Sequence, residues 1–577
     1  MNYASSIQTP GLAALPPWRS RLLFVFLLLG LCALIARAGY LQGIHNDFLQ
    51  QQGDARYGRV INIHAHRGMI TDRHGEPLAI STPVESVWAS PPDVEATPQQ
   101  IMQLAQIMGM DAKAVKSRLS DTGRDFVYLK RLLPPEQAAK IMRLEIPGVS
   151  LQREYRRYYP DGDVTAHLLG FTDLDDNGQE GLELAFQEEL GGKAGSQRVI
   201  KDRKGRIVED VASIRAPKPG SNLALSIDSK MQYLAFREIK LAVEQHRAKS
   251  GSIVVLDAHS GEVLALANWP SFNPNNRDKP GLDVLRNRAV TDLFEPGSTM
   301  KPFAVAAALN AGKVTPKTVI NTEHGKMMVS GKMIHDTHPE AALTVAQVIQ
   351  KSSNVGTAKI ALLLEPETLW SSLGASGFGA STGSEFPGEA GGKLRDYKTW
   401  RPIEQATMSY GHGISVSLLQ LARAYTIFAN DGRLMPVSLL KLDSAVSGQK
   451  VYSDTTARQV RDMLELAVQP TGTAPLARIN GYRVAGKTGT AHKLEGGRYV
   501  DRYVSSFVGL APASNPRLIV AVKIDEPGGK EYYGGLVAAP VFSNVMGAAL
   551  HLLNVPNDAP LDHEVMPSQA GIVREEV

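Results

Sequence analysis

The sequence predicts a multidomain α+β protein: an N-terminal transmembrane helix, an α/β domain, and a C-terminal domain in which helices flank an antiparallel sheet. Three observations lead to this prediction. An apolar run lies near the start of the chain, a break rich in proline at 216–220 separates two modules, and the second module begins with a strand hairpin. With 577 residues, 43% apolar and 21% charged, the chain can form more than one globular domain.

The first element is an uninterrupted hydrophobic stretch, Leu22–Ala36, which extends to Leu41 if Arg37 reaches towards the bilayer surface. About 20 apolar residues span the hydrocarbon core of a membrane. We therefore expect a retained transmembrane helix at 22–41, with residues 1–21 in the cytoplasm. A cleaved signal peptide is the alternative, because residues 36–38 loosely match a small-x-small cleavage site.

Charge and cysteine content narrow the class of protein further. The net charge of +4 is small for this length and gives no reason to expect a nucleic-acid partner. The only cysteine, Cys32, lies inside the hydrophobic stretch. The rest of the chain therefore has no disulfide and no cysteine-based metal site, which fits an oxidising compartment.

The pattern of the chain changes along its length. Residues 42–220 alternate short strand-like and helical stretches with many charges, and residues 221–556 contain the hairpin pattern 251–267 followed by long apolar helices. Strand patterns return at Ser505–Leu510 and Leu518–Ile524. The last residues, 557–577, combine prolines with acidic positions and are expected to form a disordered tail.

A serine and a lysine lie one helical turn apart in Glu295–Phe303 (EPGSTMKPF), and the apolar pattern that follows stops at Gly312. Residues at i and i+3 share a helix face, so the side chains of Ser298 and Lys301 can touch. A serine beside a possible base is a nucleophile suited to acyl transfer. We therefore predict that Ser298 is the nucleophile and that Lys301 activates it.

The motif is weak by itself, because Ser-x-x-Lys occurs again at 447–450. Two companions follow the first occurrence in order: Ser352-Ser353-Asn354, after an apolar stretch, and Lys487–Thr490, between two strand patterns. Each companion pattern also occurs a second time, Ser-x-Asn at 271–273 and Lys-[Ser/Thr]-Gly at 249–251. These second occurrences, together with 447–450, are called the decoy motifs. Patterns of this kind occur together in class A β-lactamases and penicillin-binding proteins, so their order and their flanks carry the prediction.

The chain resembles the class B penicillin-binding proteins, specifically the division-type (penicillin-binding protein 3 type) peptidoglycan transpeptidases, in the segments EPGSTMKPF, KSSNVG and GKTGTA. Residues 67–79, 153–160 and 181–183 resemble the pedestal domain of the same family. The resemblance implies an elongated pedestal (dimerisation-type) domain at 42–220 and a transpeptidase domain of the penicilloyl-serine transferase fold at 221–556. The clustered charges of the pedestal form either a structural ion-pair network or a docking surface.

The resemblance also implies roles for the site residues. Ser352 would relay a proton, Asn354 would hold the peptide amide of the substrate, and the segment Lys487, Thr488, Gly489 and Thr490 would bind the terminal carboxylate of the donor. Backbone N–H groups of Ser298 and Thr490 would form the oxyanion hole. Lys301 would have to be neutral; lowering its pKa to about 7 takes roughly 4–5 kcal/mol, which burial, a helix N-terminus and Lys487 would supply.

The implied activity is a D,D-transpeptidase that cross-links peptidoglycan. Ser298 would release the last D-alanine of a D-Ala-D-Ala stem peptide and transfer the acyl group to an amine on a neighbouring strand, and β-lactams would acylate the same serine. The implied partners are a SEDS-family glycan polymerase and other division proteins. We expect residues 22–41 to anchor the protein in the bacterial inner membrane with the catalytic domain in the periplasm, and we expect no metal or organic cofactor.

Several alternatives stay open. The nearest alternatives are an elongation-type or condition-specific paralogue and a non-catalytic β-lactam-binding scaffold. Asn354 favours a role in septal cell-wall synthesis, because elongation-type relatives often have aspartate at this position. A class A β-lactamase is disfavoured because the pattern E-x-x-L-N is absent, and a β-lactam sensor because the nearest H-E-x-x-H candidate fails at Pro567. A bifunctional class A penicillin-binding protein is disfavoured because its glycosyltransferase pattern is absent. The acceptor amine is not defined by the sequence.

Overall fold

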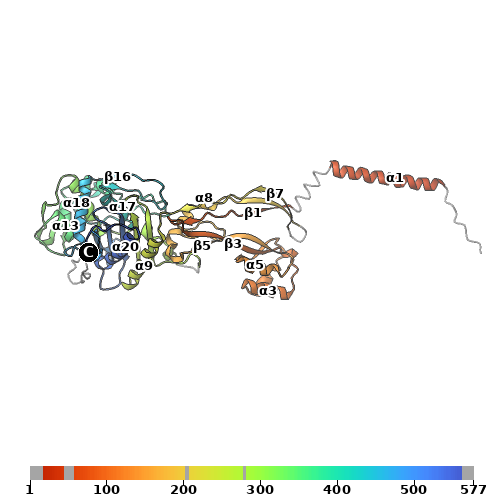
Figure 1. The fold of residues 1–577 in the computed structure, drawn as a ribbon, viewed down its shortest axis with the longest axis horizontal. Helices are drawn as coiled ribbons and strands as arrows, with labels where there is room; N and C mark the ends of the chain where they lie inside the picture. Colours follow the sequence, from red (N-terminus) through yellow and green to blue (C-terminus); the bar gives the residue numbers. More distant parts are fainter. Residues whose placement is uncertain (1–16, 45–57, 202–206, 277–280, 562–577) are drawn as a thin grey trace, which may run out of the picture. The chain divides into compact units, whose positions relative to one another are not determined.

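The computed structural model describes residues 17–44, 58–201, 207–276 and 281–561, and the chain forms two compact units (Figure 1). The smaller unit comprises Met1–His64, Val84–Glu154 and Ala194–Lys218; the larger comprises Ala65–Pro83, Tyr155–Lys193 and Pro219–Val577. Two segments of the predicted 42–220 domain therefore belong to the larger unit, because they pack against residues distant in sequence. The predicted domain limits remain a prediction.

The N-terminal apolar stretch forms helix α1 (Pro17–Gly39), followed by a π-helical turn, Tyr40–Ile44. The candidate membrane span is Trp18–Gln42, with a mean hydropathy of 2.4 and no buried residues. Within the described residues it is the one helix long and apolar enough to cross a bilayer. The predicted helix is confirmed through Gly39, and its retention in a membrane remains a prediction. Most of the predicted cytoplasmic segment, residues 1–16, lies outside the described residues.

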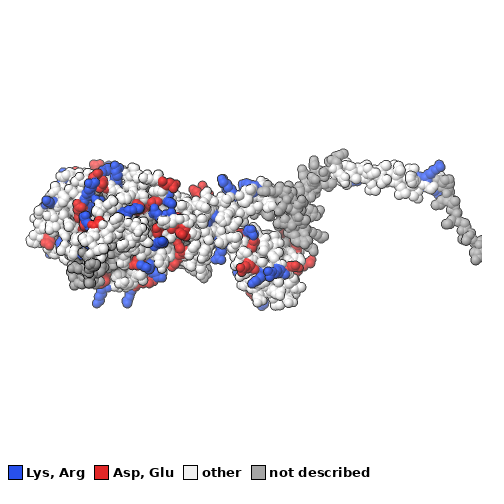
Figure 2. Space-filling view, in the orientation of Figure 1, with Lys and Arg blue, Asp and Glu red and all other residues white. Residues whose placement is uncertain are grey.

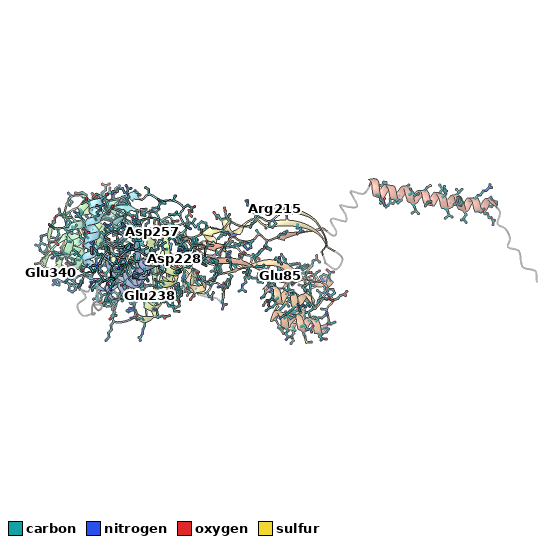
Figure 3. The ribbon with its side chains drawn as sticks, in the orientation of Figure 1. Glu85, Arg215, Asp228, Glu238, Asp257 and Glu340 are labelled. Carbon is teal, nitrogen blue, oxygen red and sulfur yellow. The ribbon has the colours of Figure 1, made fainter. Side chains whose placement is uncertain are left out.

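The smaller unit has a core between strands and three short helices. The second half of β3 (Pro77–Ala89) pairs with β4 (Val127–Leu133) and β5 (Val149–Tyr158), and helices α3 (Pro98–Met108), α4 (Ala112–Leu119) and α5 (Pro135–Met142) supply apolar residues to the same core. A separate antiparallel sheet contains β1 (Gly58–Ile63), β6 (Gly195–Lys201) and β7 (Ile207–Arg215). Glu85 and Arg153, on neighbouring strands, form an ion pair of 3.3 Å (Figure 3 labels Glu85).

The larger unit is built on a five-stranded antiparallel sheet in the order β10-β9-β19-β18-β17. Its strands are β9 (Ser250–Asp257), β10 (Val263–Trp269), β17 (Ala485–Glu495), β18 (Arg498–Ala511) and β19 (Leu518–Asp525). The predicted hairpin and both terminal strand patterns are therefore confirmed. Every residue of β9 is buried, because successive side chains enter two different apolar cores on the two faces of the sheet.

Helices cover both faces of this sheet. Helices α9 (Ser229–Gln245) and α20 (Ala539–Leu552) contribute to one core, and α12 (Lys301–Asn310) and α17 (Leu418–Ala429) to the other. Asp228, labelled in Figure 3, caps α9 by accepting from the backbone N–H groups of Lys230 and Met231. Because α12 is apolar on all sides and buried through residue 309, the residues at its N-terminus are fixed deep in the unit.

Most of the remaining elements of the larger unit are short, and the exception is α18 with 15 residues. They are β2 (Ile70–Thr71), α6 (Ala166–Leu169), α7 (Gly181–Ala185), α8 (Gln187–Gly191), β8 (Leu223–Ala224), α10 (Leu282–Leu285), α11 (Arg288–Thr291), β11 (Val319–Asn321), β12 (Lys326–Val329), β13 (Lys332–His335), β14 (Ala342–Thr344), α13 (Val345–Lys351), α14 (Asn354–Ala361), α15 (Pro366–Ala375), α16 (Pro402–Ser409), β15 (Arg433–Leu434), β16 (Gln449–Lys450), α18 (Asp454–Val468) and α19 (Gly534–Val537).

Three charges of the pedestal-like segments are buried in the larger unit. The carboxylate of Glu183 on α7 accepts from Arg67 at 2.7 Å and from Arg157 at 2.6 Å, and all three side chains are almost fully excluded from solvent. Arg67 also donates to the carbonyl of Glu183. These charges form a structural ion-pair network and do not form a docking surface. On the visible face of the larger unit, basic and acidic side chains intermingle (Figure 2).

The start of the predicted disordered tail is held in place. The carboxylate of Asp558 accepts from the backbone N–H of Arg483 at 2.7 Å and from the hydroxyl of Ser514 at 2.6 Å. The prediction of disorder was therefore wrong for residues 557–561, because an acidic position found partners on the larger unit. Residues 562–577 lie outside the described residues.

Candidate active site

The predicted nucleophile lies in a tight turn immediately before a buried helix. Ser298 belongs to the 3₁₀ turn Gly297–Met300, which continues directly into α12 at Lys301. Gly297 has φ of +56°, a conformation that favours glycine, and Pro302 is tolerated because it falls in the first turn of α12. Ser298 is only 5% exposed and Lys301 only 1% exposed. The predicted pair therefore shares one buried turn.

Lys301 contacts the second motif. Its ammonium donates to the hydroxyl of Ser352 at 3.0 Å and also to the Ser352 backbone carbonyl. Ser352 ends helix α13 in the left-handed conformation, with φ of 61° and ψ of 39°, which is uncommon for a residue with a side chain. This backbone conformation presents the hydroxyl and the carbonyl of Ser352 to the same cation.

The carboxylate of Asp336 holds the turn of the second motif in place. Ser353 caps α14 by accepting from the N–H of Gly356 at 2.8 Å and donates to Asp336 at 2.5 Å. Asp336 also accepts from the N–H of Val355, and the amide of Asn354 donates to the carbonyl of His335 at 3.1 Å. Asp336 was missed by sequence reasoning, since it follows strand β13 with no pattern that links it to the motif.

The third motif lies on β17, the last strand of the sheet. Lys487 is fully buried, and its ammonium lies 3.2 Å from the hydroxyl of Thr488. Thr488 and Thr490 share one face of the strand. The hydroxyl of Thr488 bonds to that of Thr473 at 3.0 Å, and the hydroxyl of Thr490 accepts from the N–H of Gly534 at 3.0 Å. Sequence reasoning missed Thr473, a loop threonine without a motif.

Strand β17 packs directly against the turn that carries Ser298. A Cβ atom on Gly489 would lie 2.7 Å from the carbonyl oxygen of Pro296 and 3.0 Å from the Thr299 methyl group. A hydrogen bond from the hydroxyl of Tyr425 to the carbonyl of Thr299, at 3.0 Å, also stabilises this turn. The first and third motifs are thus in backbone contact, and Lys301 connects the first to the second.

The carboxylate of Glu295 holds the glycine-rich segment 410–413 against the Ser298 turn. Glu295 accepts from the N–H of Gly413 at 2.9 Å and from the hydroxyl of Tyr499 at 3.0 Å. Burial raises the pKa of Glu295 above its usual range. Burial lowers the pKa of His412 to about 4, so this imidazole is neutral at pH 7.

The ring of His412 packs against those of Tyr410 and Tyr499, with centroids 5.3 and 5.8 Å apart. Tyr532 stacks between Tyr503 and Tyr533, with ring centroids 4.1 and 4.5 Å apart. These contacts make Tyr532 a packing residue.

The decoy motifs have other partners. Lys450 forms an ion pair with Asp454, and Ser447 lines a separate polar cavity. Ser271 donates to the carbonyl of Asp163, and Lys249 pairs with Glu526. Among the described residues, no group of three or more histidine, cysteine, aspartate or glutamate side chains could hold a metal ion.

The site combines a buried serine, a lysine bonded to a second serine, and a lysine-bearing edge strand on an antiparallel sheet. This arrangement is typical of the class of serine enzymes that carry the Ser-x-x-Lys and Lys-Thr-Gly patterns. Comparison with family models agrees. Residues 251–547 match the penicillin binding protein transpeptidase domain, and residues 62–225 match the penicillin-binding protein dimerisation domain. The chain therefore belongs to the penicillin-binding protein transpeptidase family.

Similar proteins cover nearly the whole chain. The probable peptidoglycan D,D-transpeptidase PenA of Neisseria meningitidis is 44% identical over 92% of this chain and 91% of its own length. The peptidoglycan D,D-transpeptidase FtsI of Escherichia coli K12 is 42% identical over 94% and 93%. The solved transpeptidase domain of Burkholderia pseudomallei penicillin-binding protein 3 is 50% identical, with a TM-score of 0.54, over 58% of this chain and 98% of that domain. These matches confirm the predicted family and fold class.

Proposed function

We propose that this protein is a peptidoglycan D,D-transpeptidase that works through an acyl-enzyme on Ser298 and acts in septal cell-wall synthesis. The observation that carries the proposal is the hydrogen bond from Lys301 to Ser352, in a buried site one turn from Ser298. It connects a possible base to a second hydroxyl, one helical turn from the proposed nucleophile, as a proton path would require. The relatives named D,D-transpeptidases, at 42–44% identity over most of the chain, support the same reaction.

In the first half-reaction, the Ser298 oxygen attacks the carbonyl carbon of the penultimate D-alanine while neutral Lys301 accepts the hydroxyl proton. The tetrahedral oxyanion is bound by the backbone N–H groups of Ser298 and Thr490. The C–N bond then breaks, and the proton passes from Lys301 through Ser352 to the departing D-alanine amine. An ester on Ser298 remains.

In the second half-reaction, the acceptor amine attacks the ester carbonyl and gives up a proton along the same path. The C–O bond to Ser298 breaks, the serine recovers its proton from Lys301, and the new amide is the cross-link. A β-lactam follows the first half-reaction only: its ring carbonyl acylates Ser298, but the amine released stays tethered within the bound molecule.

The resemblance to the family supports roles for the other motif residues. Lys487, Thr488 and Thr490 bind the terminal carboxylate of the donor with one charge and two hydroxyls, and Gly489 lets this strand approach the Ser298 turn. Asn354 holds the peptide amide of the donor. Helix α1 anchors the chain in the inner membrane, with the catalytic domain in the periplasm and with a SEDS-family polymerase and other division proteins as partners.

The test is labelling of the full-length protein in detergent with a fluorescent penicillin. The variant Ser298→Ala removes the proposed nucleophile, and Ser447→Ala removes the serine of the decoy motif as a matched control. A long-lived adduct that is lost only in Ser298→Ala supports the proposal. A rapidly decaying adduct would make the protein a hydrolase, and the absence of an adduct in the wild type would favour a non-catalytic scaffold.

A further inference from the structure

A cavity of about 800 Å³ lies in the larger unit beside the proposed active site. Its walls come from the segment 291–295 that leads to the Ser298 turn, the segment 413–415, residues of strands β17, β18 and β19, and the side chains of Arg286, Lys393 and Arg395. None of the predicted catalytic or carboxylate-binding residues lines it. Its volume is within the range of pockets that bind small organic molecules.

A buried lysine lines the cavity. Lys523 on β19 is only 3% exposed, and in the described part of the chain its ammonium makes no hydrogen bond and no ion pair. Its near neighbour is the ring of Phe294, whose centroid is 5.3 Å away. A cation–π contact of this kind replaces only part of the hydration that a buried ammonium loses. Burial accordingly lowers the pKa of Lys523.

The carboxylates around the cavity have hydrogen-bond or ion-pair partners other than Lys523, although the charges of Asp292 and Asp525 also act on the Lys523 ammonium. Asp525 pairs with Lys493 at 3.0 Å, and Asp292 pairs with Arg286 at 2.5 Å. Glu295 is occupied by the N–H of Gly413 and the hydroxyl of Tyr499. Five cationic and three acidic side chains line the cavity, so its charge is positive; the cations are Arg286, Lys393, Arg395, Lys493 and Lys523.

Apolar side chains complete the walls of this cavity. Leu293, Phe294, Ile414, Leu494 and Val504 face the same space as the cations. A fully hydrated inorganic anion would gain little from such walls, whereas the carbon skeleton of an organic acid would bury apolar surface against them.

We infer that this cavity is a second binding site that takes a carboxylate attached to an aliphatic or peptide body, with Lys523 as its central cation. The ligand is either an acidic peptide side chain or a free small organic acid, since both present the same group. The inference is independent of the proposed transpeptidase reaction. Because Glu295 lies at the edge of the cavity and three residues before Ser298, an occupant would contact the segment that leads to the catalytic turn.

The test measures binding to the full-length protein in detergent by isothermal titration calorimetry. Three probes separate the sources: N-acetyl-Ala-Glu-amide for a peptide carboxylate, glutarate for a free acid, and inorganic phosphate for an anion without a carbon skeleton. N-acetyl-Ala-Gln-amide is the uncharged control. We expect the acidic dipeptide or glutarate to bind, and the amide control and phosphate to bind at least tenfold more weakly.

The matched variants are Lys523→Met, which keeps the length of the side chain without its charge, and Lys450→Met, which removes an exposed lysine elsewhere. A hydrogen bond to a charged group is worth about 1.5–3 kcal/mol, so Lys523→Met should weaken binding roughly ten- to hundredfold, while Lys450→Met should not. Lys523→Arg keeps the charge and should retain binding even if Lys523→Met folds poorly.

Three outcomes would overturn the inference: equal binding by Lys523→Met, phosphate binding as tight as that of the organic acids, or no carboxylate binding to the wild type at millimolar concentration. Penicillin labelling of Ser298 in the same samples reports on the fold and on the proposed reaction separately. If the wild-type protein is labelled normally by penicillin but binds no carboxylate, the second binding site is refuted and the proposed reaction is not.

Discussion

The contact between strand β17 and the Ser298 turn predicts a specific loss of acylation in Gly489→Ala. The new Cβ atom would lie 2.5 Å from the Ser506 hydroxyl, which can rotate away, and 2.7 Å from the Pro296 carbonyl, which belongs to the backbone. Ordinary contact begins near 3.4 Å, so the strand and the turn must separate by about 0.7 Å. Overpacking of this kind costs about 1–3 kcal/mol of stability.

The larger effect should be on the reaction, because the same shift changes the distance from Ser298 to Thr490 and to the carboxylate-binding strand. Misplacement by about 1 Å can cost roughly a hundredfold in rate, so we expect a ten- to hundredfold fall in the second-order rate of acylation by a fluorescent penicillin. Stopped-flow labelling of the full-length protein measures this rate.

The matched control is Gly374→Ala on helix α15, where a Cβ atom would meet nothing within 4 Å. Replacing a helical glycine by alanine should stabilise the protein by about 0.5–1 kcal/mol and leave acylation unchanged. If Gly489→Ala is acylated as fast as the wild type, strand β17 does not set the geometry of the Ser298 turn, and the reasoning fails.

Three further predictions concern proton transfer, buried charge and pH. Ser352→Ala should slow penicillin acylation roughly 10²–10⁴-fold with the fold intact by circular dichroism, since Lys301 loses its hydroxyl partner; an unchanged rate would remove Ser352 from the proton path. Glu183→Gln leaves two buried arginines without their carboxylate and should lower the unfolding free energy in urea by about 3–5 kcal/mol; a loss below 1 kcal/mol would contradict the structural network. Burial lowers the pKa of His167 from 6.5 to about 4, so the unfolded chain takes up a proton first as the pH falls. Stability should therefore drop by up to about 3 kcal/mol between pH 6.5 and 4, and His167→Gln should flatten this slope in urea titrations.

Local sequence patterns predicted the parts of the fold that depend on local order. The spacing of apolar residues and the turn residues between them predicted the hairpin of β9 and β10 and the helix after Ser298. These predictions are confirmed. The order of the three motifs likewise identified residues that the fold brings together. The start of the helix at Lys301, one turn later than Ser298, needed the 3₁₀ geometry that the Pro296-Gly297 break imposes.

Contacts between distant segments could not be predicted in this way. Asp336, Thr473 and Glu295 each fix a motif residue or its neighbour, yet each is a single polar residue that no spacing links to its partner. The assignment of residues 65–83 and 155–193 to the larger unit has the same cause. Their charges are buried there by tertiary contacts, and sequence alone shows only that the charges are clustered.

The glycines of the motifs show why the site depends on backbone contact. A Cβ atom on Gly411 would lie 2.2 Å from the Gly297 carbonyl, just as one on Gly489 would meet the Pro296 carbonyl. The Ser298 turn is therefore enclosed by two other backbone segments with no side chain between them. Side chains change rotamers readily, whereas packed backbone moves only with its whole element. A turn held in this way can keep Ser298 and Lys301 in a reactive arrangement before substrate arrives, and this preorganisation is what acyl transfer requires of a lysine-activated serine.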